Sequence, residues 1–183
     1  MNWKQFKQDK RIRGTVQCIM VIFLLIGAIS CVSPVEKVDG FTVVESEYSD
    51  VPGNLSIGLA NIHAIVPDIE TNKEKILQVI NVFKGYNVNM IIFPEFCISG
   101  YFWDDADACW AYQESGVIEN QGDWLLEVES KLDNDLQFII FNALREGPNG
   151  KFMNSTFVIN KNLDYSNPEY IYDKTMLPGI EKQ

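Results

Sequence analysis

The stretch NMIIFPEFCISGY, residues 89–101, decides how this chain folds. Residues 89–93 are a short and almost wholly apolar run, which is typical of a strand buried on both faces of a sheet. Pro94 ends this strand, and Gly100 marks the turn that follows it. Glu95 is therefore predicted to stand at the carboxyl end of a central strand, where α/β proteins commonly build their sites.

The segments around this stretch alternate between strand and helix patterns. Residues 71–74 (Thr-Asn-Lys-Glu) read as a capping box at the start of a helix, whose apolar residues then recur every three or four positions until Gly85 ends it. A second helix is predicted at 123–132. Strands are predicted at 55–62, 89–93, 136–143, 151–161 and 169–174. The order β-α-β-α-β-β-β indicates an α/β chain in which helices cover a mixed sheet.

The amino terminus has the pattern of a targeting or anchoring segment. Residues 1–31 carry a net charge of +4, and an apolar run over 16–29 follows the basic residues. Three interpretations stay open: a cleaved signal peptide, a bacterial lipoprotein signal with Cys31 as the lipidated residue, and an uncleaved membrane anchor formed by one hydrophobic helix. The positive-inside rule places the remaining chain on the extracytoplasmic side of the membrane.

Charge and composition also divide the rest of the chain. Residues 32–54 contain Pro, Gly, Ser and acidic residues without helical periodicity, so we expect an extended linker before a domain over 55–183. Residues 32–183 carry a net charge of −14. Such an acidic body argues against a nucleic-acid partner, because binding phosphates requires clustered basic residues.

The sequence offers little for a metal site. His63 is the only histidine, which excludes a multi-histidine site. Asp104, Asp105 and Asp107 form an acidic cluster, but their spacing lacks the glycine and the closing glutamate of a calcium loop. We therefore expect no metal and no cofactor.

A second polar element follows the last predicted strand. Residues 172–177 read Tyr-Asp-Lys-Thr-Met-Leu, which places Lys174 at a strand end about eighty residues after Glu95. A carboxylate and an ammonium group at two strand ends are the groups expected of a general base and of a donor that stabilises an oxyanion.

These elements together resemble the amino-terminal part of the carbon–nitrogen hydrolase (nitrilase) superfamily. The resemblance covers residues 55–183 and rests on the 55–62 strand, the following helix, the stretch 89–101 and the element 172–177. It implies a layered α-β-β-α sandwich, incomplete here, and a Glu-Lys-Cys catalytic triad. It also implies a small-molecule amide, carbamoyl or nitrile substrate, and assembly into a homo-oligomer.

The resemblance implies a role for each matching residue. Glu95 corresponds to the general base, Lys174 to the oxyanion stabiliser, and Glu181 to a supporting glutamate that family members carry after the lysine. The family's nucleophilic cysteine follows the lysine, but no cysteine follows Lys174 in this sequence. We therefore interpret the chain as a fragment that lacks its nucleophile. Cys97 and Cys109 are weaker alternatives for that role.

Two other functions remain open. A membrane-anchored binding module of the same fold, or a pseudoenzyme remnant, would keep the carboxylate and the aromatic residues and catalyse nothing. Transfer of an acyl group to an amine would use the same triad as hydrolysis. A cysteine after Lys174 in the native gene would favour the two catalytic interpretations.

Overall fold

The computed structural model describes residues 35–46, 55–101, 106–118, 122–161, 167 and 170–175, without the side chains of 106–109 and 113. The chain divides into two compact units, Met1–Asp50 and Val51–Gln183. The predicted hydrophobic helix and Cys31 lie outside the described residues. Within the described ranges, no helix combines the length and the apolar character needed to cross a membrane.

The described part of the first unit is a β-hairpin. Strand β1 (Val35–Val38) pairs antiparallel with β2 (Phe41–Val44), and the turn consists of Asp39 and Gly40, both at positive φ. A two-residue turn of this type matches the twist of the strands that it joins. Within the linker predicted over 32–54, residues 35–44 therefore form two paired strands, which the sequence analysis did not predict.

The second unit contains a five-stranded sheet with the order β3-β4-β5-β6-β7. The first three strands are parallel, and β6 and β7 continue the sheet in antiparallel pairing. The strands are β3 (Ile57–Leu59), β4 (Met90–Ile92), β5 (Phe138–Glu146), β6 (Phe152–Ile159) and β7 (Ile171–Asp173). The expected mixed α/β architecture is therefore confirmed.

The described helices of this unit are α2 (Ile69–Lys84), α3 (Ala106–Ser115), α4 (Asp123–Ser130) and the short 3-10 turn η1 (Pro148–Gly150). Helix α2 begins earlier than predicted, because the side chain of Asp68 accepts the hydrogen bond from the Thr71 backbone N–H (3.0 Å). The predicted capping box at 71–74 is therefore wrong. Helix α3 was not predicted.

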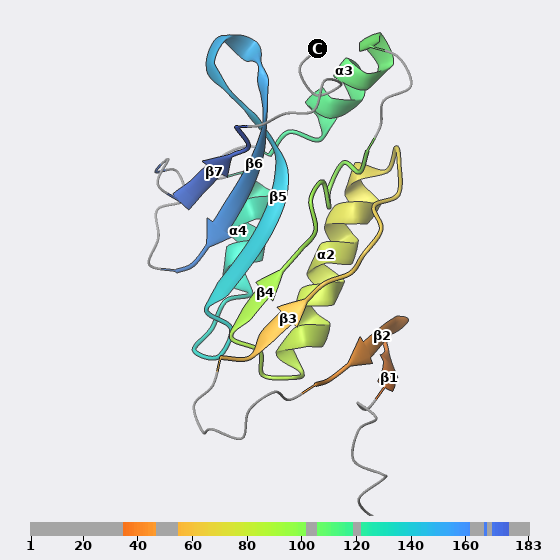
Figure 1. The fold of residues 1–183 in the computed structure, drawn as a ribbon, viewed down its shortest axis with the longest axis vertical. Coiled ribbons are helices and arrows are strands. Elements are labelled where there is room, and N and C mark those ends of the chain that lie inside the picture. Colours follow the sequence, from red (N-terminus) through yellow and green to blue (C-terminus); the bar gives the residue numbers. More distant parts are fainter. Residues whose placement is uncertain are drawn as a thin grey trace, which may run out of the picture. The chain divides into compact units, whose positions relative to one another are not determined.

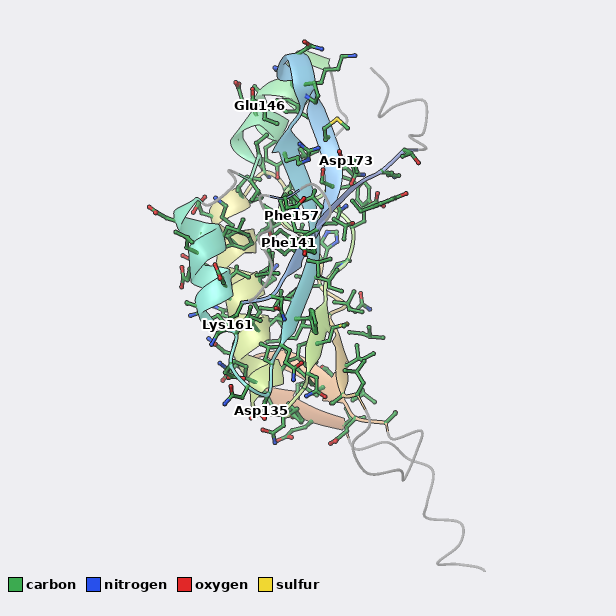
Figure 2. The ribbon with its side chains drawn as sticks, turned by 90° about the vertical axis from the view of Figure 1, so that its left-hand side faces the viewer. Asp135, Phe141, Glu146, Phe157, Lys161 and Asp173 are labelled. Atoms are coloured by element: carbon green, nitrogen blue, oxygen red, sulfur yellow. The ribbon has the colours of Figure 1, made fainter. Side chains whose placement is uncertain are left out.

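Helices α2 and α4 cover one face of the sheet (Figures 1 and 2). Phe141 of β5 is fully buried there, stacked on Phe157 of β6 and in edge contact with Trp124 of α4. At β3 the helix lies so close that a Cβ on Gly58 would come within 2.8 Å of the Phe83 ring. The buried apolar side chains on this side form the core: Ile76, Ile80, Ile91, Leu125, Val128, Ile139, Phe141, Phe157 and Ile159.

The opposite face of the sheet is covered far less by the described residues. Ile57, Leu59 and Tyr172 are 47%, 71% and 64% exposed, and Ile92 and Ile140 are half-buried. Strand β4 is therefore not buried on both faces within the described part of the chain. This second face carries the polar side chains described next.

Candidate active site

Glu95 lies in the turn that follows β4. The turn places Phe96 at φ 52° and Gly100 at φ 65°. A Cβ on Gly100 would come within 2.7 Å of the Val66 side chain, so both the positive φ and the close approach require glycine here. Phe96 keeps an unfavourable backbone conformation for a non-glycine residue, which is common where a turn presents a functional group.

A buried asparagine of helix α2 holds this turn in place. Asn72 is 1% exposed, and its Nδ2 donates to the carbonyl oxygens of Ile65 and Ile98 (both 2.8 Å). Its Oδ1 accepts from the Ile65 N–H (2.7 Å). A buried amide with all these partners satisfied ties the turn that carries Glu95 to the helix and to the loop before it.

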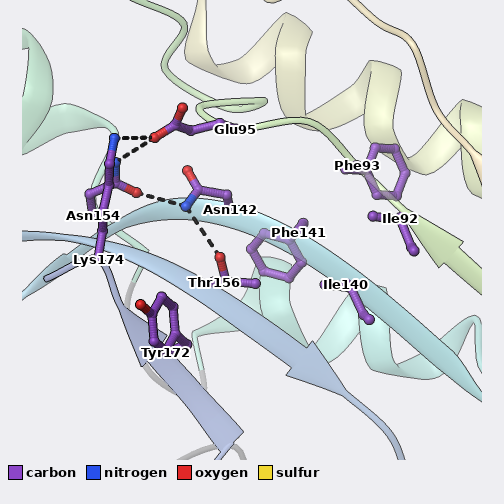
Figure 3. Close-up of a pocket in the computed structure, with 10 residues that line it drawn as sticks. All are labelled: Ile92, Phe93, Glu95, Ile140, Phe141, Asn142, Asn154, Thr156, Tyr172 and Lys174. Carbon is purple, nitrogen blue, oxygen red and sulfur yellow. Dashed lines mark hydrogen bonds and ion pairs between the residues drawn. The ribbon is translucent and has the colours of Figure 1, made fainter. Parts of the chain in front are cut away.

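Lys174 directly follows β7, and the pairing of β7 with β6 sets its position. Asp173 is held by Arg145 Nε (2.9 Å) and by Ser155 Oγ (2.6 Å), both of which donate to Asp173 Oδ1. The Arg145 guanidinium, with a smaller contribution from the Ser155 hydroxyl, holds the pKa of Asp173 below its ordinary value. The hydrogen bonds to Asp173 fix the end of β7, and from this strand end the Lys174 side chain extends toward Glu95 (Figure 3).

Glu95 and Lys174 form an ion pair. Lys174 Nζ lies 2.7 Å from Glu95 Oε1. The Lys174 side chain is 30% exposed and the Glu95 side chain is 38% exposed. Burial raises the pKa of Glu95, but hydrogen bonds from Lys174, Asn154 and Tyr101, together with the lysine charge, outweigh it and hold the pKa below its ordinary value. Glu95 is therefore a carboxylate at neutral pH.

Three further side chains belong to this site, and the sequence predictions had not placed them in it. Tyr101 OH donates to Glu95 Oε2 (2.8 Å), and Asn154 Nδ2 donates to Glu95 Oε1 (2.9 Å). Asn142 Nδ2 donates in turn to Asn154 Oδ1 (2.7 Å). One signal was present in the sequence: Asn142 and Asn154 are polar residues inside otherwise apolar strands.

A pocket of about 330 Å³ opens beside these groups. Its polar end is formed by Glu95, Asn142, Asn154 and Lys174, and its apolar part includes Ile92 and Ile140 (Figure 3). The lining is completed by Phe93, Phe141, Thr156 and Tyr172. In such a site the carboxylate can accept the proton of a nucleophile. The neighbouring ammonium group can stabilise the negative charge that develops on a carbonyl oxygen.

Cys97 is not placed as a nucleophile. Its side chain is 2% exposed, and its thiol donates to the Asn142 carbonyl oxygen (3.3 Å). Burial raises the pKa of Cys97 to about 12, so the reactive thiolate form is scarce at neutral pH. The side chain of Cys109, and Glu181 altogether, lie outside the described residues.

The described residues also give no metal site, since no cluster of three or more His, Cys, Asp or Glu side chains is found among them. His63 lies in the loop before α2, where its backbone carbonyl accepts from Lys75 Nζ (2.9 Å). The cluster at Asp104, Asp105 and Asp107 lies outside the described side chains.

Comparison with known proteins gives a family and a fold. The sequence model of the carbon–nitrogen hydrolase family matches residues 56–182. The structure of an N-terminal amidase is similar, with a TM-score of 0.53 and 19% identity over 70% of this chain and 29% of that chain. The structure of an N-terminal amidase with an Asn-Glu-Ala peptide has a TM-score of 0.54 and 19% identity over 70% of this chain and 30% of that chain. At these identities the likeness shows the fold, and it confirms the expected nitrilase-type fold.

A glutamine-dependent NAD+ synthetase from Acinetobacter baumannii in complex with ADP is also similar (TM-score 0.49, 20% identity, 68% of this chain and 22% of that chain). The chain thus spans less than a third of the length of the solved structures that it matches. No curated protein sequence matches it.

Proposed function

This chain belongs to the carbon–nitrogen hydrolase family, and on that premise we propose that the complete protein hydrolyses a non-peptide carbon–nitrogen bond through a Glu-Lys-Cys mechanism. One observation carries the proposal. Within the matched region, Glu95 and Lys174 meet at 2.7 Å beside a pocket, although 79 positions separate them in the sequence. Amides, carbamoyl compounds and nitriles all offer the electrophilic carbon that such a site requires.

In the proposed reaction on an amide, Glu95 takes the proton of a cysteine thiol, and the sulfur attacks the carbonyl carbon. The carbonyl oxygen gains a negative charge, which the Lys174 ammonium group stabilises. Collapse of this intermediate breaks the C–N bond, and Glu95 returns the proton to the leaving ammonia or amine. Glu95 then takes a proton from water as the oxygen attacks the thioester. Breaking of the C–S bond releases the acid, and Glu95 returns the proton to the sulfur, which restores the free thiol.

The proposed nucleophile is a cysteine of the complete protein outside these 183 residues. No cysteine follows Lys174 in this sequence, and the buried Cys97 thiol has a pKa of about 12. The rival proposal from the sequence, a binding module or pseudoenzyme of the same fold, has the same Glu95–Lys174 pair and lacks this cysteine.

Thiol labelling of the complete gene product separates the two proposals. We expect iodoacetamide at neutral pH to alkylate one cysteine outside residues 1–183 rapidly, with loss of ammonia release from a panel of small amides, while Cys97 stays unmodified. Peptide mass mapping locates the label. A complete protein with no rapidly alkylated cysteine other than Cys18, Cys31 or Cys109, and with no turnover of amides or nitriles, would be a binding module.

We propose in addition that residues 1–31 attach the protein to the extracytoplasmic side of a membrane. The support is the basic amino terminus, the apolar run over 16–29 and the small residues before Cys31. We expect the complete protein in the membrane fraction of a bacterial expression host, and, if Cys31 carries the lipid, mass spectrometry should find a chain that begins at a lipid-modified Cys31 and is absent from a Cys31→Ser variant. A membrane-bound wild-type protein that keeps residues 1–31 and carries no lipid would indicate an uncleaved anchor.

A further inference from the structure

Asn154 contacts both members of the Glu95–Lys174 pair. Its side-chain Nδ2 donates to Glu95 Oε1 (2.9 Å), and its backbone carbonyl oxygen accepts from the Lys174 N–H (2.8 Å). The residue is 7% exposed and lies on β6, the strand next to β7. One buried asparagine thus connects the turn after β4 with the end of β7.

The orientation of the Asn154 amide is fixed by a directed series of hydrogen bonds. The backbone N–H of Phe96, which can only donate, donates to Asn142 Oδ1 (2.8 Å). Asn142 must therefore present its Nδ2 to Asn154 Oδ1 (2.7 Å), and Asn154 must present its own Nδ2 to Glu95. The series begins at the backbone of Phe96 and ends at the carboxylate of Glu95, which directly precedes Phe96 in the chain.

This arrangement makes the two oxygens of the Glu95 carboxylate unequal. Oε1 accepts from Lys174 Nζ (2.7 Å) and from Asn154 Nδ2 (2.9 Å), which uses both of its lone pairs. Among the described residues, Oε2 accepts only from Tyr101 OH (2.8 Å). Oε2 therefore keeps the capacity to accept a further proton.

We infer that Asn154 is a positioning residue of the carbon–nitrogen hydrolase site: oriented by Asn142, it holds Glu95 Oε1 against Lys174 and leaves Oε2 as the oxygen that exchanges the proton. The inference rests on the proposed function for its kinetic consequences only. That Asn154 holds the Glu95 carboxylate is a separate claim, and a titration of Glu95 tests it in the absence of any substrate.

The kinetic test uses Asn154→Ala and Asn154→Asp in the complete protein. Loss of a hydrogen bond to a charged group lowers kcat about 10- to 100-fold in Asn154→Ala. The acid limb of kcat/KM moves to higher pH, because the lost donor had favoured the charged form of Glu95. Asn154→Asp keeps the shape and adds a like charge, so its acid limb moves further in the same direction.

Asn160→Ala is the matched control. Asn160 follows the other end of β6 and donates to the Gln137 carbonyl oxygen (2.7 Å), so its loss removes an equivalent bond away from Glu95. We expect wild-type kcat and an unchanged pH profile. If Asn154→Ala does not fold, Asn142→Asp serves instead, because it keeps the oxygen that accepts from Phe96 and loses the bonds that Asn142 Nδ2 donates to Asn154 (2.7 Å) and to Thr156 Oγ1 (3.4 Å).

A carbon-13 NMR titration of the Glu95 carboxyl group, assigned with Glu95→Gln, separates this inference from the proposed function. An upward shift of the Glu95 midpoint in Asn154→Ala supports the positioning role even if the protein turns over no substrate. An unchanged midpoint, or wild-type kinetics in Asn154→Asp, would overturn it and leave Asn154 as a packing residue.

Discussion

Replacing Glu95 with glutamine is expected to lower kcat of the complete protein about 10³- to 10⁴-fold, at the upper end of what general acid–base catalysis contributes. The proposed mechanism uses this carboxylate twice, first for the thiol proton and then for the proton of water. Glutamine keeps the shape and a carbonyl oxygen that can accept from Lys174, so the fold should be retained. Steady-state ammonia release measures the loss, and circular dichroism checks the fold.

The pH profile of the wild-type protein belongs to the same prediction. A base is active as the carboxylate, so activity is present above the pKa of Glu95 and is lost as the pH falls through it. Since that pKa lies below its ordinary value, the acid limb of kcat/KM should lie at lower pH than the titration of an unperturbed glutamate.

Glu74→Gln is the matched control for Glu95→Gln. Glu74 is an exposed glutamate of α2, and the same substitution there should leave kcat unchanged. A Glu95→Gln variant that retains kcat within tenfold of wild type would remove Glu95 from the role of general base.

Replacing Lys174 with alanine is expected to lower kcat about 10²- to 10³-fold, the loss typical of removing one donor to an oxyanion. The change has a second effect. Without the ammonium group, Glu95 loses a hydrogen bond and a neighbouring positive charge, so its pKa rises and the acid limb moves to higher pH. The pH dependence of kcat/KM measures both effects.

Lys174→Arg and Lys161→Ala complete this experiment. Arginine keeps the charge but presents a planar fork, so we expect partial recovery of kcat and an acid limb near that of wild type. Lys161 is exposed at the end of β6, and its removal should change neither quantity. Equal kcat for Lys174→Ala and wild type would exclude the lysine from stabilising the intermediate.

The strand-end positions of Glu95 and Lys174 could be predicted because their signals are local. An apolar run that stops at Pro94 identifies the end of β4, and the residues that precede Lys174 identify β7. Their contact came only from the family resemblance, since no local pattern relates two residues so far apart. The structure brings them to 2.7 Å, and their catalytic roles stay predictions.

The polar network behind Glu95 could not be predicted for the same reason. Asn142 interrupts the apolar β5, but its partners Phe96 and Asn154 lie on other elements, and only the register of the sheet brings them together. An unexpected polar residue inside a strand signals that a partner exists, without identifying it.

Two errors in the helix predictions have identifiable causes. Residues 71–74 fit the capping-box pattern, but burial of Ile69 and the cap from Asp68 start α2 earlier. Helix α3 has no clear apolar stripe in its sequence, so periodicity gave no signal for it. Its Tyr112 hydroxyl donates to the Ser99 carbonyl oxygen, which is a tertiary contact that no local pattern reveals.

The separation in sequence of the groups around Glu95 also limits when this site can appear during folding. The bonds from Asn154 and Lys174 span 59 and 79 positions, so each closes a long loop whose entropy cost must be met before the contact forms. Contacts of this range form slowly and depend on strands β4 to β7 being assembled in register. We therefore expect the Glu95–Lys174 pair to form late in folding, after strands β4 to β7 have paired.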